Sequence, residues 1–396
     1  MSKPHSPNQA VNQLGDQLSS EKRKLSFFFG AGTSMSVGLP GVFALTSKVI
    51  DDIDAKYKDK LIKLKNLCSS SNIEVILNKL RTIRELIDDS ETESYHDITG
   101  KTFAQEFDLA ICSTIATLVA KTAATSIDPH LNFANWLFKY QINRLSPVEL
   151  FTTNYDLLLE EAFEERKIPY FDGFVGTINP FLVPECIDAE NTKQYDHVYV
   201  PPSWLRHWKI HGSVNWFLYK DGGAKKRITR NTSRKIIPGD ELMIFPSRQK
   251  YDESRRLPFL LFQDRLRKFL SQGEVLLIIN GYSFNDEHIN EIIFQALRAN
   301  KRLAVTALMF GDFVDNSSGG PKIRKIDEKI LKYGLEYPNL TILGPDKACV
   351  GGNISTWLFD GTPTSDDIFW IDTEKIFDLG DFVTFTNYLK VQFHHA

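Results

Sequence analysis

Cysteine is scarce in this sequence, and its spacing excludes two common kinds of stabilising site. The 396 residues include only four cysteines, Cys68, Cys112, Cys186 and Cys349, and no two of them form a C-x-x-C pair. This spacing rules out a zinc ribbon and gives no disulfide framework. We therefore expect four buried free thiols and no bound metal.

Long apolar runs and a strong net charge are also missing. No apolar run reaches the roughly 18 residues that a membrane-spanning helix needs, and Met1–Lys24 has no apolar signal core. The formal net charge is -3, so no global charge indicates nucleic acid or a membrane surface as a partner. With 42% hydrophobic and 24% charged residues, the composition is that of a globular protein, and we expect a cytoplasmic one.

Strand-forming segments alternate with helical ones along most of the chain. This alternation predicts an α/β fold, Rossmann-like, with a doubly wound and mostly parallel sheet. Residues 58–139 depart from it, because their apolar residues recur at helical spacing and strand signals are missing. We expect a core of residues 1–57 and 140–396 that carries a large helical insertion, 58–139. The expected strands are Leu25–Phe29, Pro147–Thr153, Trp208–Ile210, Leu242–Phe245, Val275–Ile279, Leu303–Phe310 and Leu340–Leu343; the expected helices of the core are Phe43–Tyr57, Asp156–Arg166, Leu257–Leu270, His288–Ala299 and Ile323–Tyr333; Asp88–Lys101 and Ile168–Pro202 are expected to be irregular.

Four polar or glycine-rich segments follow expected strands, at the sheet edge where open α/β folds bind ligands. The first is the run Gly30-Ala31-Gly32-Thr33-Ser34. Glycines there would let the backbone approach a diphosphate, with amide hydrogens and the Ser34 hydroxyl as donors. The alternative is an ordinary glycine turn, since the run lacks the full G-x-G-x-x-G spacing.

The second segment, Thr152–Asp156, places Asn154 and Asp156 where a strand turns into a helix. Both residue types are preferred as helix N-caps, but one cap needs only one of them. The third segment places His211 before Gly212, so its ring is expected at the mouth of a strand, where a histidine is either structural or a proton acceptor.

The fourth segment is Gly281-Tyr282-Ser283-Phe284-Asn285-Asp286, which leads from a buried strand into a helix. Ser283 could bind a ribose or phosphate, and Asn285 or Asp286 an adenosine hydroxyl. Helix capping is the competing explanation for the last two residues.

In this order, the four segments resemble the sirtuin-like NAD-binding family over roughly Leu25 to Asn300, outside the helical insertion. The chain looks more closely like the NAD-hydrolysing sirtuin-like proteins of bacterial anti-phage defence, some of which work beside a HerA-type hexameric ATPase. It departs from deacetylase sirtuins, which carry a four-cysteine zinc module and have Gln and Ile where this chain has Thr153 and Tyr155. Both differences weaken a protein-deacylase interpretation.

The resemblance implies an NAD+ glycohydrolase (NADase) that releases nicotinamide and ADP-ribose and depletes NAD during defence. By the same resemblance, Asn154 orients the ribose or the water, Asp156 contacts the nicotinamide carboxamide, and His211 binds a ribose hydroxyl or acts as base. The implied nucleotide-binding residues are Gly30, Ala31, Gly32, Thr33, Ser34, Thr153, Gly281, Ser283 and Asn285. We also expect a homo-oligomer, because free NAD cleavage would be toxic and needs restraint.

Three alternatives remain open at this point. An NAD-dependent deacylase or ADP-ribosyltransferase would use a protein as acceptor, and a non-catalytic sensor would bind NAD or ADP-ribose without product. The range Lys220–Lys235 also holds seven basic residues against the single acid Asp221. Such a run is usually a solvated face, but it could dock DNA or an acidic partner.

Overall fold

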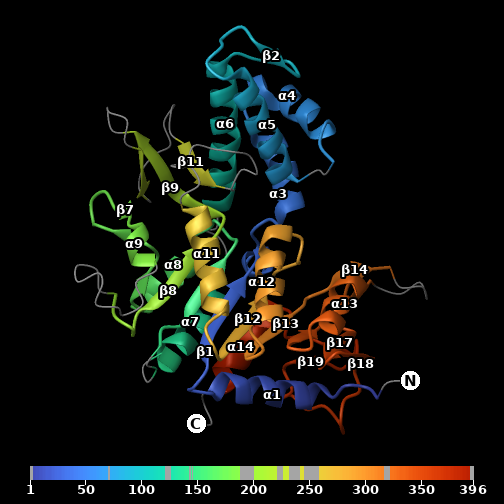
Figure 1. Ribbon diagram of the computed structural model, residues 1–396. Helices are drawn as coiled ribbons and strands as arrows, with labels where there is room; N and C mark the ends of the chain where they lie inside the picture. The colour runs from blue at the N-terminus through green and yellow to red at the C-terminus, as the bar shows by residue number, and fades with distance from the viewer. Residues whose placement is uncertain are drawn as a thin grey trace.

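The computed structural model describes residues 3–69, 72–120, 126–141, 144, 146–187, 200–220, 226–231, 241–244, 258–315 and 322–392. These residues form one large sheet with helices on both faces, and a helical unit lies beyond one end of it (Figure 1). The strands of the large sheet are β1 (Lys24–Phe29), β4 (Glu149–Thr152), β5 (Tyr170–Phe171), β8 (Leu205–Lys209), β12 (Val275–Asn280), β13 (Leu303–Leu308), β16 (Leu340–Leu343), β17 (Lys347–Val350) and β18 (Asn353–Thr356).

The order of this sheet is β18-β17-β16-β13-β12-β1-β4-β8-β5. Every pairing from β5 to β16 is parallel, and only β17 and β18 at one edge are antiparallel. The chain winds from β1 toward β4 and β8, and later from β12 toward β13 and β16. The prediction of a doubly wound, mostly parallel α/β sheet is therefore confirmed.

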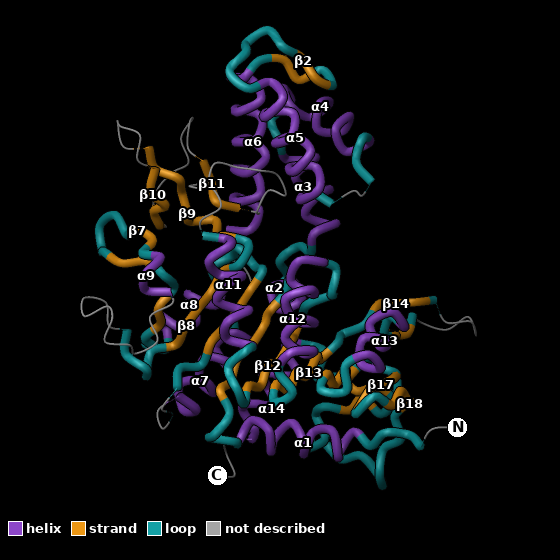
Figure 2. The backbone as a smooth tube through the Cα atoms, in the orientation of Figure 1, coloured by secondary structure: helices purple, strands orange, loops and turns teal. Residues whose placement is uncertain are grey.

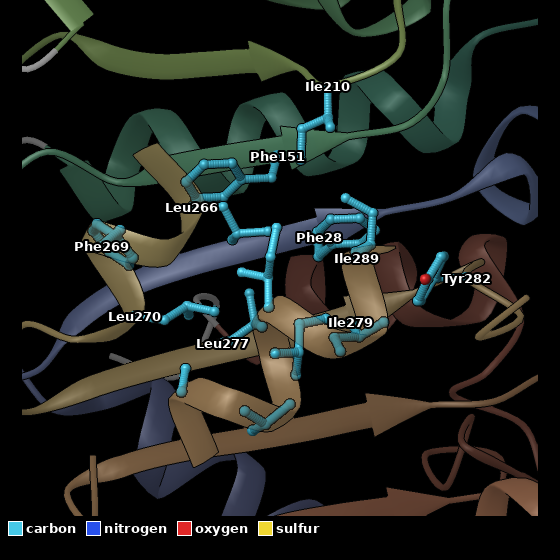
Figure 3. Packing of buried hydrophobic residues seen from close by; sticks show 14 of the residues in the cluster. Phe28, Phe151, Ile210, Leu266, Phe269, Leu270, Leu277, Ile279, Tyr282 and Ile289 are labelled. Carbon is cyan, nitrogen blue, oxygen red and sulfur yellow. The ribbon is translucent and has the colours of Figure 1, made fainter. Parts of the chain in front are cut away.

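Alternate residues of β1 show how the two faces are covered. Phe28 packs in a buried cluster with α11 (Phe259–Leu270), α12 (Glu287–Ala299) and α13 (Glu328–Glu336), and Figure 3 shows it with Leu277 and Ile279 of β12. Phe27 and Phe29 face the opposite cluster, because successive strand residues point to opposite sides. The helices of that second face are α1 (Pro7–Ser19), α7 (Asp128–Gln141), α8 (Leu158–Glu165) and α14 (Phe382–Gln392).

A helical unit packs beyond the carboxyl ends of the strands (Figure 2). It consists of α3 (Val42–Asp52), α4 (Ala55–Asn66), α5 (Ile73–Ile87) and α6 (Lys101–Ala120), with a small hairpin of β2 (Ser94–Tyr95) and β3 (Ile98–Thr99). Its core extends beyond these helices, because Leu158 and Phe217 belong to the same buried cluster and Tyr155 and Val214, which follow strands of the large sheet, pack against it. The helical unit and the strand-end loops therefore share one hydrophobic core.

A second sheet lies beside the first in the order β11-β9-β10-β7-β6. Its strands are β6 (Phe174–Val175), β7 (Phe181–Leu182), β9 (Gly212–Lys220), β10 (Lys226–Arg230) and β11 (Glu241–Ile244). The remaining elements are α2 (Ala31–Met35), α9 (Pro184–Ile187) and two strand pairs, β14 (Asp312–Val314) with β15 (Ile323–Lys325) and β19 (Trp370–Ile371) with β20 (Ile376–Phe377).

Several expected boundaries were wrong for local reasons. The expected helix Phe43–Tyr57 is broken, because Asp54 accepts the Lys56 amide at 2.8 Å and so begins α4. The expected helix Ile323–Tyr333 starts as strand β15, and α13 begins only after Asp327 caps it. Strand pairs also occur where none were predicted, at Asp88–Lys101 and within Ile168–Pro202.

Candidate functional site

The winding of the large sheet reverses between β1 and β12. Connections from β1 lead to one side and connections from β12 to the other, and ligands of open α/β sheets bind outside the carboxyl ends of the strands at such a point. The residues that follow these strands are Gly30 and Gly281, in the first and fourth predicted segments. Topology therefore brings two of the four segments together at this switch point.

The glycines of these two segments lie in direct backbone contact. A Cβ on Gly30 would stand 2.5 Å from the Gly281 oxygen, and one on Gly32 would stand 2.6 Å from the Gly281 Cα. Gly281 itself has a φ of +68°. Close approach of two turns thus requires glycine here, whatever ligand binds.

The predicted diphosphate donors need correction on one point. The amides of Gly30, Gly32 and Thr33 donate to the carbonyls of Asn280, Gly281 and Gly30 at 3.1, 2.9 and 3.1 Å. The Gly30 and Gly32 amides hold the two turns together and the Thr33 amide closes the first turn, so all three are engaged within the protein. Direct donation from them to a diphosphate, as expected from the glycine pattern, does not fit this conformation.

Gly281→Ala should lower the free energy of unfolding by at least about 2 kcal/mol, because a left-handed backbone and a steric clash combine. Its Cβ would lie 2.6 Å from the Thr33 nitrogen. Gly352→Ala is the matched control, since Gly352 has a φ of +76° but an added Cβ there would meet nothing within 4 Å. Urea unfolding of both variants measures the difference; equal losses would argue against tight contact between the turns.

Asn154 joins the strand end of β4 to the glycine-rich turn. Its Nδ2 donates to the Gly30 carbonyl at 3.0 Å, to Thr33 Oγ1 at 2.9 Å and to Ser34 Oγ at 2.8 Å. Ser34 Oγ in turn donates to Asp156 Oδ2 at 2.6 Å. Asn154 and Asp156 are each only 8% exposed, so this network is almost fully withdrawn from solvent.

Asp156 combines two roles that the sequence left as alternatives. Its Oδ1 accepts the Leu158 amide at 3.1 Å in the first turn of α8, while its Oδ2 binds Ser34. Asn154 does not cap this helix, because its side-chain amide points to the turn at Gly30–Ser34 instead. Asn154 therefore belongs to the strand-end network alone. Asp156 belongs to that network and also binds the first turn of α8.

His211 lies in the turn between β8 and β9 and is hydrogen-bonded to Asp286. Its Nε2 is 2.9 Å from Asp286 Oδ2, and the imidazole is buried. Burial alone would lower the pKa of His211, but the hydrogen bond to Asp286 and the nearby carboxylates of Glu74 and Asp286 outweigh it and raise the pKa. The pKa of Asp286 is lowered: its burial is outweighed by the same hydrogen bond. The two groups therefore favour a charged pair.

Asp286 is also the N-cap of α12. Its Oδ1 accepts the amides of His288 at 2.9 Å and Ile289 at 3.2 Å, leaving Oδ2 for His211. The competing explanations of this residue, capping and function, therefore use different oxygens. The sequence offered Asp286 as a helix cap or as a contact for an adenosine hydroxyl, and its pairing with His211 is seen only in the three-dimensional structure.

The segments that carry Asn154 and His211 run side by side. The Ile210 amide donates to the Thr152 carbonyl at 2.8 Å, and the Val214 amide to the Tyr155 carbonyl at 2.9 Å. The His211–Asp286 bond then reaches from the end of β8 to the loop after β12, although β1 and β4 lie between these strands. All four predicted segments therefore meet over one edge of the sheet.

The other predicted residues are placed less specifically. Ala31, Ser283 and Asn285 are exposed, whereas Thr153 is half-buried and its amide donates to the Phe29 carbonyl at 3.2 Å. Thr152, which we had not assigned, contributes more: its Oγ1 donates to the Phe29 carbonyl at 2.9 Å and accepts the Asn154 amide at 3.0 Å. Its place two residues before Asn154, at the end of the strand, was the signal that could have identified it.

The cysteines and the basic range are the remaining features singled out from the sequence. All four cysteines are free, with Cys68 half-buried and the others buried. Within the described residues, no group of three or more His, Cys, Asp or Glu could hold a metal ion, and no helix is long and apolar enough to cross a membrane. In Lys220–Lys235, Arg230 turns inward to pair with Asp172, while Lys225, Arg234 and Lys235 lie outside the described residues.

Fold and geometry define a doubly wound α/β protein with a buried amide and imidazole at its switch-point edge. Residues 148–328 match the SIR2-like domain family. The matched region runs from the start of β4 to the start of α13, so it includes Asn154, His211 and Asp286 but neither β1 nor the glycine-rich turn.

Comparison with curated proteins finds no match. Among solved structures, a similar chain is a mutant Sir2 homologue in complex with ADP-ribose. The similarity covers 78% of this chain and 88% of that one, with a TM-score of 0.39 and 11% identity. The domain match therefore identifies a SIR2-like region.

Proposed function

We propose that this protein is an NAD+ glycohydrolase that cleaves the bond between nicotinamide and ribose. The observation that carries the proposal is the meeting of Asn154 and Asp156 with the His211–Asp286 pair over the switch-point edge. Three of these segments lie in the SIR2-like region, and the sequence resemblance to NAD-hydrolysing sirtuin-like proteins supports the same substrate.

The reaction needs little acid catalysis from the protein. The nicotinamide nitrogen of NAD is cationic and leaves as neutral nicotinamide, while the ribose develops oxocarbenium character as in glycoside cleavage. Water then attacks the anomeric carbon and one proton is released with ADP-ribose. The protein has to orient the ribose, admit a single water and accept that proton.

His211 is the group suited to accept the proton. With Nε2 protonated and donating to Asp286 Oδ2, Nδ1 is the ring nitrogen left with a lone pair. Asp286 fixes this orientation of the ring, as the carboxylate of a catalytic triad does for its histidine. Asn154 would hold the ribose or the water, and Asp156 the carboxamide of nicotinamide.

The direct test is product analysis after the purified chain is mixed with NAD. Nicotinamide and ADP-ribose should form in equal amounts with no peptide present, because hydrolysis needs only water. Formation of product only when an acylated peptide or another protein acceptor is added would favour the deacylase or ADP-ribosyltransferase alternative. Saturable NAD binding without any product would favour the sensor.

Asp286→Asn should shift the acid limb of the pH profile to lower pH. Neutral His211 is the active form, and its raised pKa places the rise in wild-type activity above the usual histidine value. Asparagine keeps the helix cap through its oxygen and removes the charge, so the limb should move down by about one pH unit. Its NH2 group would donate to Nε2 and leave the imidazole proton on Nδ1, so the plateau of kcat/KM should fall as well. The measurement is kcat/KM against pH; an unmoved limb would mean that His211 is not the titrating group.

The resemblance also supports proposals about partners. We propose a homo-oligomer that is restrained until a signal of phage infection, with a HerA-type ATPase as a candidate partner. The shared core of α3–α6 and the strand-end loops gives such a partner a physical path to the site. Light scattering and NAD hydrolysis, each with and without the ATPase, test both points; a monomer with unrestrained activity would contradict them.

A further inference from the structure

A buried lysine lies directly beneath the strand-end network. Lys209 is the last residue of β8, and its side chain is 2% exposed. Its Nζ donates to the main-chain carbonyl of Asp156 and, at 2.8 Å, to Glu160 Oε1 of α8. The Nε2 of His207 lies 3.4 Å from the same Glu160 oxygen.

The ion pair with Glu160 accounts for only part of this arrangement. Burial alone would raise the pKa of Glu160, but Lys209 and His207 reverse the effect and hold it well below its usual value. A buried pair of this kind is costly to desolvate, and apolar side chains can often replace it without loss of stability. Stability of the fold therefore does not explain why the Lys209 ammonium group also donates to the main-chain carbonyl of Asp156.

The position of that carbonyl suggests the reason. Asp156 binds Ser34 through its side chain, and Ser34 accepts from Asn154. The Lys209 contact is thus two residues along the chain from Asn154 and within the same turn. Because Lys209 is paired with Thr152 across the strands, it is held in register with the turn that it contacts.

We propose that Lys209 is a positioning residue whose ammonium group fixes the main chain at Asp156 and so keeps Asn154 in place. The effect of Lys209 on kcat can be measured only if the proposed NAD hydrolysis is correct. Its effect on the position of Asn154 can be measured in either case. Lys209 touches neither substrate nor water in this assignment. It acts through the turn, so its removal should affect the rate more than substrate binding.

Three variants separate positioning from simple charge pairing. Lys209→Met leaves Glu160 buried without its lysine and should lower both the melting temperature and kcat. Lys209→Met/Glu160→Gln removes both charges and should recover the melting temperature, while kcat stays about 10- to 100-fold low, the range expected of a small misplacement. KM should change less than about threefold, because ground-state binding is retained. Glu160→Gln alone leaves the Lys209 ammonium without its carboxylate and should also lower the melting temperature. It keeps the contact with Asp156, so below that temperature it should retain most of the rate.

The structural readout is the side-chain amide signal of Asn154 in protein labelled with 15N-asparagine, assigned by its loss in Asn154→Asp. The signal should move in the double variant and stay in place in Glu160→Gln. If wild-type protein does not hydrolyse NAD, the proposed function fails, and this signal still decides the role of Lys209. The inference is overturned by an unmoved signal, by recovery of kcat together with stability in the double variant, or by a double variant that stays unstable.

Discussion

His211→Ala should lower kcat for NAD hydrolysis by about 100- to 10,000-fold, the usual contribution of a positioned general base. The imidazole is buried, and its hydrogen bond to Asp286 Oδ2 fixes the orientation of the ring. Alanine removes both the ring and this orientation. Alanine leaves the Asp286 cap of α12 intact, because the cap uses the other oxygen. The fold should therefore survive the substitution.

The matched control is His288→Ala, in the first turn of α12. His288 is exposed, and its amide remains available to Asp286 after the substitution. Nicotinamide release measures kcat, and calorimetric titration with ADP-ribose measures whether the affinity of the site is retained. Normal turnover in folded His211→Ala would show that the histidine is not the base. Loss of ADP-ribose binding together with turnover would show that it binds the ligand instead.

Asn154→Ala should lower kcat by about 100- to 1000-fold, the cost of losing one preorganised polar group at a reacting centre. The Asn154 amide makes three internal hydrogen bonds, so alanine also removes one hydrogen-bond donor from each of Gly30, Thr33 and Ser34. Some loss of stability is expected as a result. The rate must therefore be measured well below the melting temperature of the variant.

Asn154→Asp separates loss of the NH2 donor from loss of the whole side chain, because it keeps the shape of the side chain and removes only the donor. The control is Asn179→Ala, on an exposed turn before β7. Both Asn154 variants should lose nicotinamide release while the control keeps it. Near-normal release by a folded Asn154 variant would exclude the amide from the chemistry.

The sheet was predictable because its strands carry strong local signals. The largely apolar runs of β1, β12 and β13 are almost entirely buried on both faces, as parallel strands covered by helices require. Short elements such as β6, β7, β14 and β15 were not predictable, since two or three residues hold too little periodicity to detect. β7 in addition depends on a distant partner, since Thr229 of β10 pairs with Phe181.

The candidate site also contains residues that the sequence could predict and residues that it could not. Asn154, Asp156, His211 and Gly281 stood out because each follows a strand, and parallel strands bring their carboxyl ends to one edge. Lys209 and the pairing of Asp286 with His211 were missed, because a lysine that ends a strand and an aspartate that caps a helix have ordinary local explanations. Only the three-dimensional contacts distinguish their second roles.

The central place of β1 has a consequence for synthesis of the chain. Lys24 pairs with Val275, and Ser26 with Glu149, so both neighbours of β1 follow it only after long stretches of chain. During synthesis, the three consecutive phenylalanines of β1 would stay incompletely enclosed until β12 is made. Contacts so distant along the chain slow folding and prolong exposure to aggregation. This molecule should therefore depend on chaperones during translation more than its ordinary composition suggests.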